Sequence, residues 1–155
     1  MRGKGPTPRA PGPSLRLWCP SESSFLGLVR DVAKHMAVMA GFDDTTAGKV
    51  ALAVDEATAN AIEHAYHGDP GHLVELRIEY RGEVFKAEVV DTGDRIDPKA
   101  VPEFELRKYV NERRTGGLGV HLMAKIMDSV TFHRSARENV CCLVKRKEPN
   151  EQTTS

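Results

Sequence analysis

Residues 50–66 read VALAVDEATANAIEHAY, and this stretch decides both the fold and the candidate site that the sequence predicts. Alanine recurs at every fourth position from 53 to 65, which predicts an amphipathic helix with a small, apolar face. Glu56, Asn60 and Glu63 follow the four-then-three spacing that brings side chains together on another face of a helix. A plain helix surface is more often built from Lys and Glu pairs, so we treat this polar face as a candidate site and a solvated surface as the alternative.

The composition is that of one globular domain without a strong charge bias. The chain has 155 residues, of which 40% are hydrophobic, and this length suits one core better than two. Its 22 basic residues balance 22 acidic ones, so charge gives no reason to expect nucleic acid or an anionic membrane as a partner. No apolar run approaches the length of a membrane span, and no signal peptide is recognisable. Three cysteines, two of them adjacent, fit neither a disulfide framework nor a zinc site, so we expect a cytoplasmic protein.

The order of periodic segments predicts one α+β domain at residues 15–147, between disordered tails at residues 1–14 and 148–155. The expected order is β-α-α-β-β-α-β-β, with the helices on one face of a mostly antiparallel sheet. The last strand is apolar on both faces and is therefore expected to be a central strand. The expected strands are residues 15–19, 74–80, 84–90, 130–133 and 139–145, and the expected helices lie within residues 22–40, 43–66 and 115–128.

Two glycine-bearing segments could contact a nucleotide. Asp91, Thr92 and Gly93 follow a strand, and an ionised carboxylate can accept a hydrogen bond from the exocyclic amine of adenine, although a plain surface turn is the alternative. Residues 116–119 read GGLG at the start of a helix, where unpaired backbone N–H groups and the helix dipole favour phosphate oxygens. Glycines allow close approach to such oxygens, although glycines before a helix often form only a turn.

The polar helix face offers a base and a metal ligand. Mg²⁺ often takes one or two protein oxygens beside substrate phosphates, so Asn60 can suffice as its protein ligand. Glu56 can accept a proton from an attacking hydroxyl or water. Asp55 lies roughly a quarter turn away on the helix, so we expect it to support the site rather than act in it.

Together these segments resemble the motifs of the GHKL (histidine kinase-like) ATPase superfamily. Residues 55–66 (DEATANAIEHAY) resemble its N box, residues 91–97 (DTGDRID) its G1 box and residues 114–123 (RTGGLGVHLM) its G2 box. Within the superfamily, the chain is most similar to RsbW-type anti-sigma factor serine/threonine-protein kinases. The similarity runs from about residue 15 to residue 147 and implies a Bergerat-type ATP-binding sandwich with a mixed, mostly antiparallel sheet.

The resemblance implies a role for each matching residue. Glu56 is then the catalytic general base, and Asn60 is the ligand of Mg²⁺. Asp91 contacts adenine, with Gly93 beside it. The nucleotide-binding set implied in this way is Asn60, Asp91, Gly93, Asp97, Arg114, Thr115, Gly116, Gly117, Leu118 and Gly119.

The resemblance further implies an ATP-dependent anti-sigma factor and protein serine kinase that phosphorylates a STAS-type anti-anti-sigma factor and so regulates transcription in a stress response. It implies a homodimer that binds a sigma factor, and a lid over ATP at residues 96–115. Arg95 departs from the pattern, because many members have a second glycine there. Two alternatives stay open: an ATP-binding partner-switching module with little kinase activity, and a switch kinase that acts on a STAS scaffold without binding sigma.

Overall fold

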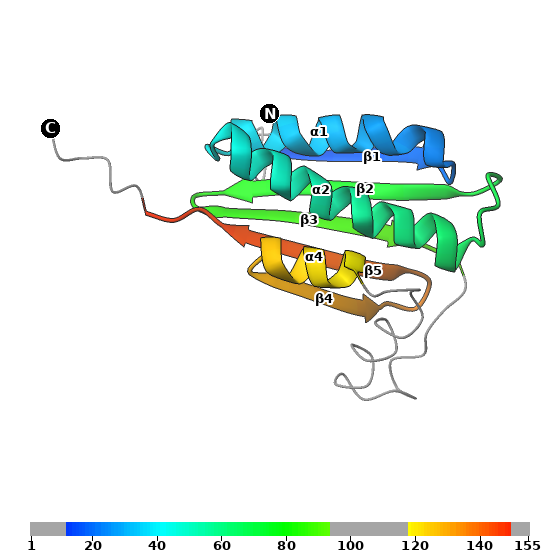
Figure 1. Ribbon diagram of the computed structural model, residues 1–155. Coiled ribbons are helices and arrows are strands. Elements are labelled where there is room, and N and C mark those ends of the chain that lie inside the picture. The colour runs from blue at the N-terminus through cyan, green and yellow to red at the C-terminus, as the bar shows by residue number, and fades with distance from the viewer. Residues whose placement is uncertain (1–11, 94–117, 150–155) are drawn as a thin grey trace, which may run out of the picture.

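The computed structural model describes residues 12–93 and 118–149 as a layer of helices on a five-stranded sheet (Figure 1). The predicted lid and most of both predicted tails lie outside these described residues. Along the chain the elements are β1 (Ser14–Pro20), η1 (Ser23–Phe25), α1 (Leu26–Met39), α2 (Asp44–Asn60), η2 (Ala61–Ala65), β2 (Leu73–Arg81), β3 (Val84–Asp91), α4 (Leu118–Ile126), β4 (Ser129–Arg134) and β5 (Asn139–Arg146). This order confirms the predicted α+β fold class. None of these helices is long and apolar enough to cross a membrane.

The sheet has the strand order β1-β2-β3-β5-β4, and its pairings between the described strands are all antiparallel. Strands β2 and β3 form an antiparallel hairpin through a two-residue turn between Arg81 and Val84. Gly82 in this turn has a φ of +57°, a conformation that glycine adopts without steric cost. Strand β5 lies between β3 and β4, which confirms that the strand with apolar residues on both faces is an interior one.

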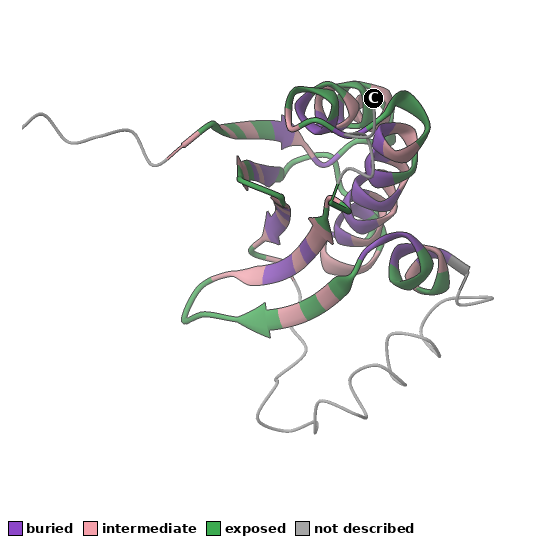
Figure 2. Cartoon of the chain, turned by 90° about the vertical axis from the view of Figure 1, so that its left-hand side faces the viewer, coloured by how far each residue is buried: buried purple, intermediate pink, exposed green. Residues whose placement is uncertain are grey.

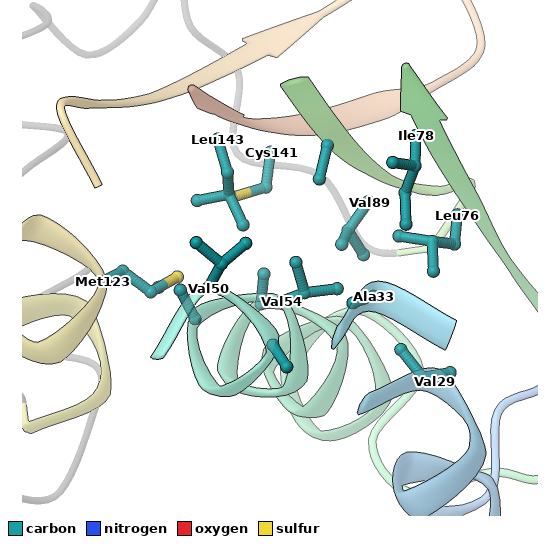
Figure 3. Packing of buried hydrophobic residues seen from close by; sticks show 14 of the residues in the cluster. Val29, Ala33, Val50, Val54, Leu76, Ile78, Val89, Met123, Cys141 and Leu143 are labelled. Carbon is teal, nitrogen blue, oxygen red and sulfur yellow. The ribbon is translucent and has the colours of Figure 1, made fainter. Parts of the chain in front are cut away.

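All the described helices lie on one face of the sheet, where the core is buried (Figures 1 and 2). Successive side chains of a strand point to opposite faces of the sheet, so every second residue of each strand faces the helix layer. Figure 3 shows the packing of this layer, in which Val50 and Val54 of α2 lie between residues of the sheet and of the other two helices. Its labelled members are Val29, Ala33, Val50, Val54, Leu76, Ile78, Val89, Met123, Cys141 and Leu143.

Helix α2 is central in the helix layer and begins at Asp44, close to the expected start at residue 43. Asp43 is its N-cap residue, and the Asp43 side chain accepts a 2.7 Å hydrogen bond from the backbone N–H of Thr46. The alanines of the repeat face the interior, with Ala53, Ala57 and Ala61 between 0% and 6% exposed. Their small side chains allow the α2 backbone to lie close to the sheet and to its neighbouring helices.

The expected α-helix to residue 66 is wrong in one detail, because the α-helix ends at Asn60 and residues Ala61–Ala65 form a π-helical turn. The N–H of Tyr66 bonds the carbonyl of Ala61 at 3.2 Å, which is the five-residue spacing of a π-turn. Such a widened turn depends on contacts made with other segments, and the regular alanine repeat carries no signal of it. Isolated π-turns occur often at functional sites.

We expect Asp43→Ala to lower the melting temperature by about 2–4 °C, because the first turn of α2 loses its side-chain cap. The hydrogen bonds from Thr46 lower the pKa of Asp43. The cap therefore contributes stability above the unfolded carboxyl pKa of about 3.9, and this contribution is lost as the pH falls through the lower folded pKa. Thermal unfolding followed by circular dichroism at pH 7 and in acid tests both statements.

Asp44→Ala is the matched control for this experiment, since it removes an exposed carboxylate from the same turn without removing the cap. Asp44 makes an exposed ion pair with Lys34 at 3.3 Å, so its loss should change the melting temperature less. Equal effects of the two substitutions at pH 7 would contradict the capping role of Asp43.

Candidate functional site

The polar face of α2 carries the predicted base and the predicted metal ligand. Glu56 and Asn60 are both half-buried and lie one helical turn apart. The Asn60 Oδ1 atom is buried and has no hydrogen-bond partner within the described part of the chain. A buried carbonyl oxygen of this kind costs about 1–3 kcal/mol unless another group completes it. Mg²⁺ prefers such hard, neutral or anionic oxygen ligands, so Asn60 fits the ion that the sequence predicts.

Asp55 lies on a different flank of α2. Its carboxylate pairs with Arg30 of α1 at 3.4 Å, so it faces α1, and Glu56 follows about 100° further round the helix. Burial raises the pKa of Asp55, while Arg30 lowers it and Glu56 raises it further. One carboxylate oxygen of Asp55 is buried without a hydrogen-bond partner in the described residues. Asp55 is thus engaged with α1, and the supporting role that the sequence predicts for it stays a prediction.

Asp91 is the last residue of β3, and its carboxylate is held by two donors. Its Oδ1 atom accepts hydrogen bonds from the Gly93 N–H at 3.1 Å and from Asn139 Nδ2 at 2.8 Å. Asn139 begins β5 and lies directly opposite Asp91 in the pairing of the two strands. The sequence analysis missed Asn139, since only the strand order shows that a residue 48 positions away meets Asp91.

Gly93 lies against the π-turn at the end of the polar helix. A Cβ atom added to Gly93 would lie 2.3 Å from the carbonyl oxygen of Ala65 and 2.8 Å from its Cβ. No side chain fits at these separations unless the backbone moves. The predicted turn at residues 91–93 is therefore packed directly on the stretch that carries Glu56 and Asn60.

Tyr66 links the same two segments, and the sequence analysis assigned it no role. Its hydroxyl lies 2.8 Å from the backbone nitrogen of Thr92 and 3.0 Å from the carbonyl oxygen of Leu73. A pocket of about 610 Å³ opens beside these contacts, and its lining includes Ala65, Tyr66, Asp69, His72, Thr92 and Gly93.

The predicted phosphate-binding segment, residues 116–119, overlaps the start of helix α4. This helix begins at Leu118 and runs beside α2 (Figure 1). The C-terminal end of α4 is fixed where Lys145 of β5 donates a 2.8 Å hydrogen bond to the carbonyl of Ile126. Asn139 lies at the opposite end of β5, so the beginning of α4 points toward the Asp91 end of the sheet (Figure 1). Gly119 in its first turn is buried.

The structure thus brings together part of the predicted nucleotide-binding set. The end of α2, the turn after β3 and the beginning of α4 lie at the same edge of the sheet (Figure 1). The members of the set that lie outside the described residues are Asp97, Arg114, Thr115, Gly116 and Gly117.

The architecture defines a class of small α+β domains in which a polar helix face, a strand-end carboxylate and the start of another helix share one edge of a sheet. Residues 19–145 match the family model described as the histidine kinase-like ATPase domain, so the chain belongs to that family. This match confirms the superfamily resemblance read from the three motifs.

Relatives with assigned names narrow the resemblance to one branch of the family. The serine-protein kinase RsbW of Bacillus licheniformis is 29% identical over 120 residues, which cover 75% of this chain and 75% of the relative. The serine-protein kinase RsbW of Staphylococcus aureus (strain MSSA476) is 27% identical over 129 residues, covering 79% of this chain and 80% of the relative. The predicted similarity to RsbW-type proteins is therefore confirmed.

Two solved structures share the fold. One contains the RsbU and RsbW domains of a Mycobacterium tuberculosis protein and matches with a TM-score of 0.62 and 18% identity. That match covers 89% of this chain and 33% of the other, so this chain spans about a third of the mycobacterial one. The other structure, the SiaB–SiaC complex from Pseudomonas aeruginosa, matches with a TM-score of 0.61, 13% identity and coverage of 84% and 88%.

We expect Gly93→Ala to lower the free energy of unfolding by about 1–3 kcal/mol, because the new methyl group overlaps the Ala65 carbonyl. Urea unfolding followed by circular dichroism measures the change. Gly48→Ala is the control, because a Cβ at this helical glycine meets nothing within 4 Å. It should be neutral or stabilising by up to about 1 kcal/mol. A Gly93→Ala protein as stable as the wild type would show that the contact with Ala65 is looser than described.

Proposed function

We propose that this chain is an ATP-dependent protein serine kinase that also binds a sigma factor, and that its protein substrate is a STAS-type anti-anti-sigma factor. The observation that carries the proposal is the polar face of α2, where Glu56 lies one turn from the buried, unpartnered oxygen of Asn60. A helix that served only as surface would have no reason to bury an amide oxygen without a partner. The serine-protein kinase names of the relatives support the type of reaction.

Each predicted site residue would have its own role in the reaction. Asp91, whose carboxylate is held by Asn139, would accept the adenine amine, and the glycines of residues 116–119 would bind the phosphates. Asn60 would hold Mg²⁺, which neutralises charge on the phosphate oxygens when it is bound. Glu56 would accept the proton of the substrate serine as that hydroxyl attacks the terminal phosphoryl group of ATP.

Phosphorylation would also control the partners of the protein. A phosphate group adds about 1.5–2 negative charges to the substrate surface and can disrupt an interface in which it is buried. Release of the phosphorylated anti-anti-sigma factor would then leave this protein free to bind sigma. A homodimer, a cytoplasmic location and a role in a stress response remain predictions of the family resemblance.

The proposal is tested by the substitution Glu56→Gln, which keeps the shape of the side chain and removes its basic oxygen. We expect transfer of labelled phosphate from ATP to the STAS protein to fall by about 10²–10⁴-fold, with ATP binding retained. Asp44→Asn, a change to an exposed carboxylate at the other end of the same helix, is the control and should leave transfer unchanged.

The outcomes separate the rival functions. Undiminished transfer by Glu56→Gln would exclude Glu56 as the base. ATP and sigma binding by the wild type without any transfer would favour a partner-switching module. Transfer without sigma binding in a pull-down assay would favour a switch kinase that acts on a STAS scaffold.

A second prediction concerns the contact between Asn139 and Asp91. Asn139→Asp places two carboxylates within hydrogen-bond distance, and such a pair repels when both are ionised and shares a proton at lower pH. We expect the affinity for ATP to fall by about tenfold at pH 8 and to recover as the pH is lowered, because a proton shared by the two carboxylates restores the hydrogen bond.

Isothermal titration calorimetry across this pH range provides the measurement, with Asn139→Ala as the control. The alanine variant loses the donor without adding a charge, so its affinity should be reduced by a constant factor relative to the wild type. If Asn139→Asp followed the pH profile of the alanine variant, the contact with Asp91 would have no part in nucleotide binding.

A further inference from the structure

We infer that Tyr66 is a positioning residue of the nucleotide site, whose hydroxyl sets the turn at residues 91–93 in the orientation that receives the nucleobase. This inference rests on the proposed function, because it assigns the turn to ATP. Tyr66 does not touch the nucleotide in this assignment. It acts through the backbone of Thr92, which lies between Asp91 and Gly93.

The hydroxyl of Tyr66 has a full set of partners at the site. It accepts a hydrogen bond from the Thr92 N–H at 2.8 Å, and its own proton goes to the carbonyl oxygen of Leu73 at 3.0 Å. Because this proton is used, the 3.3 Å contact with Thr92 Oγ1 is a donation from the threonine hydroxyl to the second lone pair of Tyr66. One hydroxyl therefore fixes both the backbone and the side chain of Thr92, and ties them to the start of β2.

The ring of Tyr66 is held in place independently of the turn. Tyr66 is 5% exposed, and its ring stacks on that of His72 with 4.5 Å between the centroids and an interplanar angle of 4°. His72 is fixed in turn by an Asp69 carboxylate oxygen, 3.2 Å from its Nε2, and by Ser21 Oγ, which accepts its backbone N–H. The hydroxyl is thus presented by a rigid support, which is what a positioning group requires.

Two side chains from outside the turn bond to it, and they bond to different residues: Asn139 to Asp91 and Gly93, and Tyr66 to Thr92. Asn139 holds the carboxylate of Asp91 from β5, whereas Tyr66 holds the backbone of Thr92 from the end of the α2 segment. If Tyr66 loses its hydroxyl, Asp91 keeps its contact with Asn139, but the backbone of Thr92 gains freedom that ATP binding must then remove. Tyr66 acts on the turn and Glu56 on the substrate hydroxyl in this assignment, so the chemical step should not depend on Tyr66 once ATP is bound.

The experiment compares Tyr66→Phe with Tyr80→Phe in nucleotide binding and in phosphoryl transfer. We expect Tyr66→Phe to raise the Kd and the KM for ATP by about 5–20-fold, with kcat at saturating ATP within about twofold of the wild type and the KM for the protein substrate unchanged. Amide hydrogen exchange at Thr92 should become faster in the nucleotide-free protein. Tyr80, half-buried on β2, tests the general effect of removing a tyrosine hydroxyl and should leave these quantities unchanged.

Each outcome supports or overturns the inference. A purely structural tyrosine would lower the melting temperature and leave the KM for ATP of the folded protein unchanged, and that result would overturn the positioning role. A loss of kcat with an unchanged KM would also overturn it. Failure of the wild type itself to bind ATP would instead overturn the proposed function, and the inference would fall with it.

A second variant covers the case in which Tyr66→Phe does not fold. His72→Ala removes the stacked ring from an exposed position and leaves the Tyr66 hydroxyl in place. We expect a smaller rise of about 2–4-fold in the Kd for ATP and an intermediate rate of exchange at Thr92. An unchanged Kd in a folded His72→Ala protein, with faster exchange at Thr92, would show that the order of the turn does not govern ATP binding.

Discussion

The rest of the structure depends on one constraint: the backbone of α2 lies close to the sheet and to the turn after β3. This helix lies over the sheet between α1 and α4, and the alanines on its inner face leave room for side chains of the sheet to fill (Figures 1 and 3). Its C-terminal continuation comes near enough to the turn after β3 that Gly93 has no space for a Cβ atom. Larger residues in the alanine repeat would move α2 outward and separate the polar face from that turn, so core packing and site geometry are set by the same side chains.

The site is shared among elements that are far apart in the sequence, and its polar contacts reflect this. Asp91 is held from β5 and Thr92 from the end of the α2 segment, while α4 is anchored by a lysine of β5. None of these contacts lies within a single helix or strand. The rigid parts of the domain therefore hold the turn at residues 91–93 from two sides, as expected where function depends on loops positioned by a scaffold.

Much of the fold could be predicted from the sequence because the periodic signals are strong. The apolar alternation that predicts β2 and β3 and the periodicity that predicts a helix from about residue 43 each report local structure, and the structure agrees with both. The π-turn at Ala61–Ala65, the role of Asn139 and the contacts of Tyr66 could not be predicted. Each of these depends on which segments the topology brings together, and an asparagine at the start of a strand or a tyrosine at the end of a helix carries no local mark of its distant partner. Motif resemblance indicated Asp91 and Gly93, but only the strand order shows what holds them.

The position of β5 between β3 and β4 has a consequence for how the protein matures during synthesis. Chains emerge from the ribosome N-terminus first, and α2 and the β2–β3 hairpin are made well before β5. The carboxylate of Asp91 has its Asn139 partner only after a separation of 48 residues has been closed. A nascent chain can thus carry the whole polar helix while the carboxylate of Asp91 still lacks its Asn139 partner, which β5 supplies. Contacts of such large sequence separation form late in folding, so competence to bind a ligand would mark a chain whose sheet is finished.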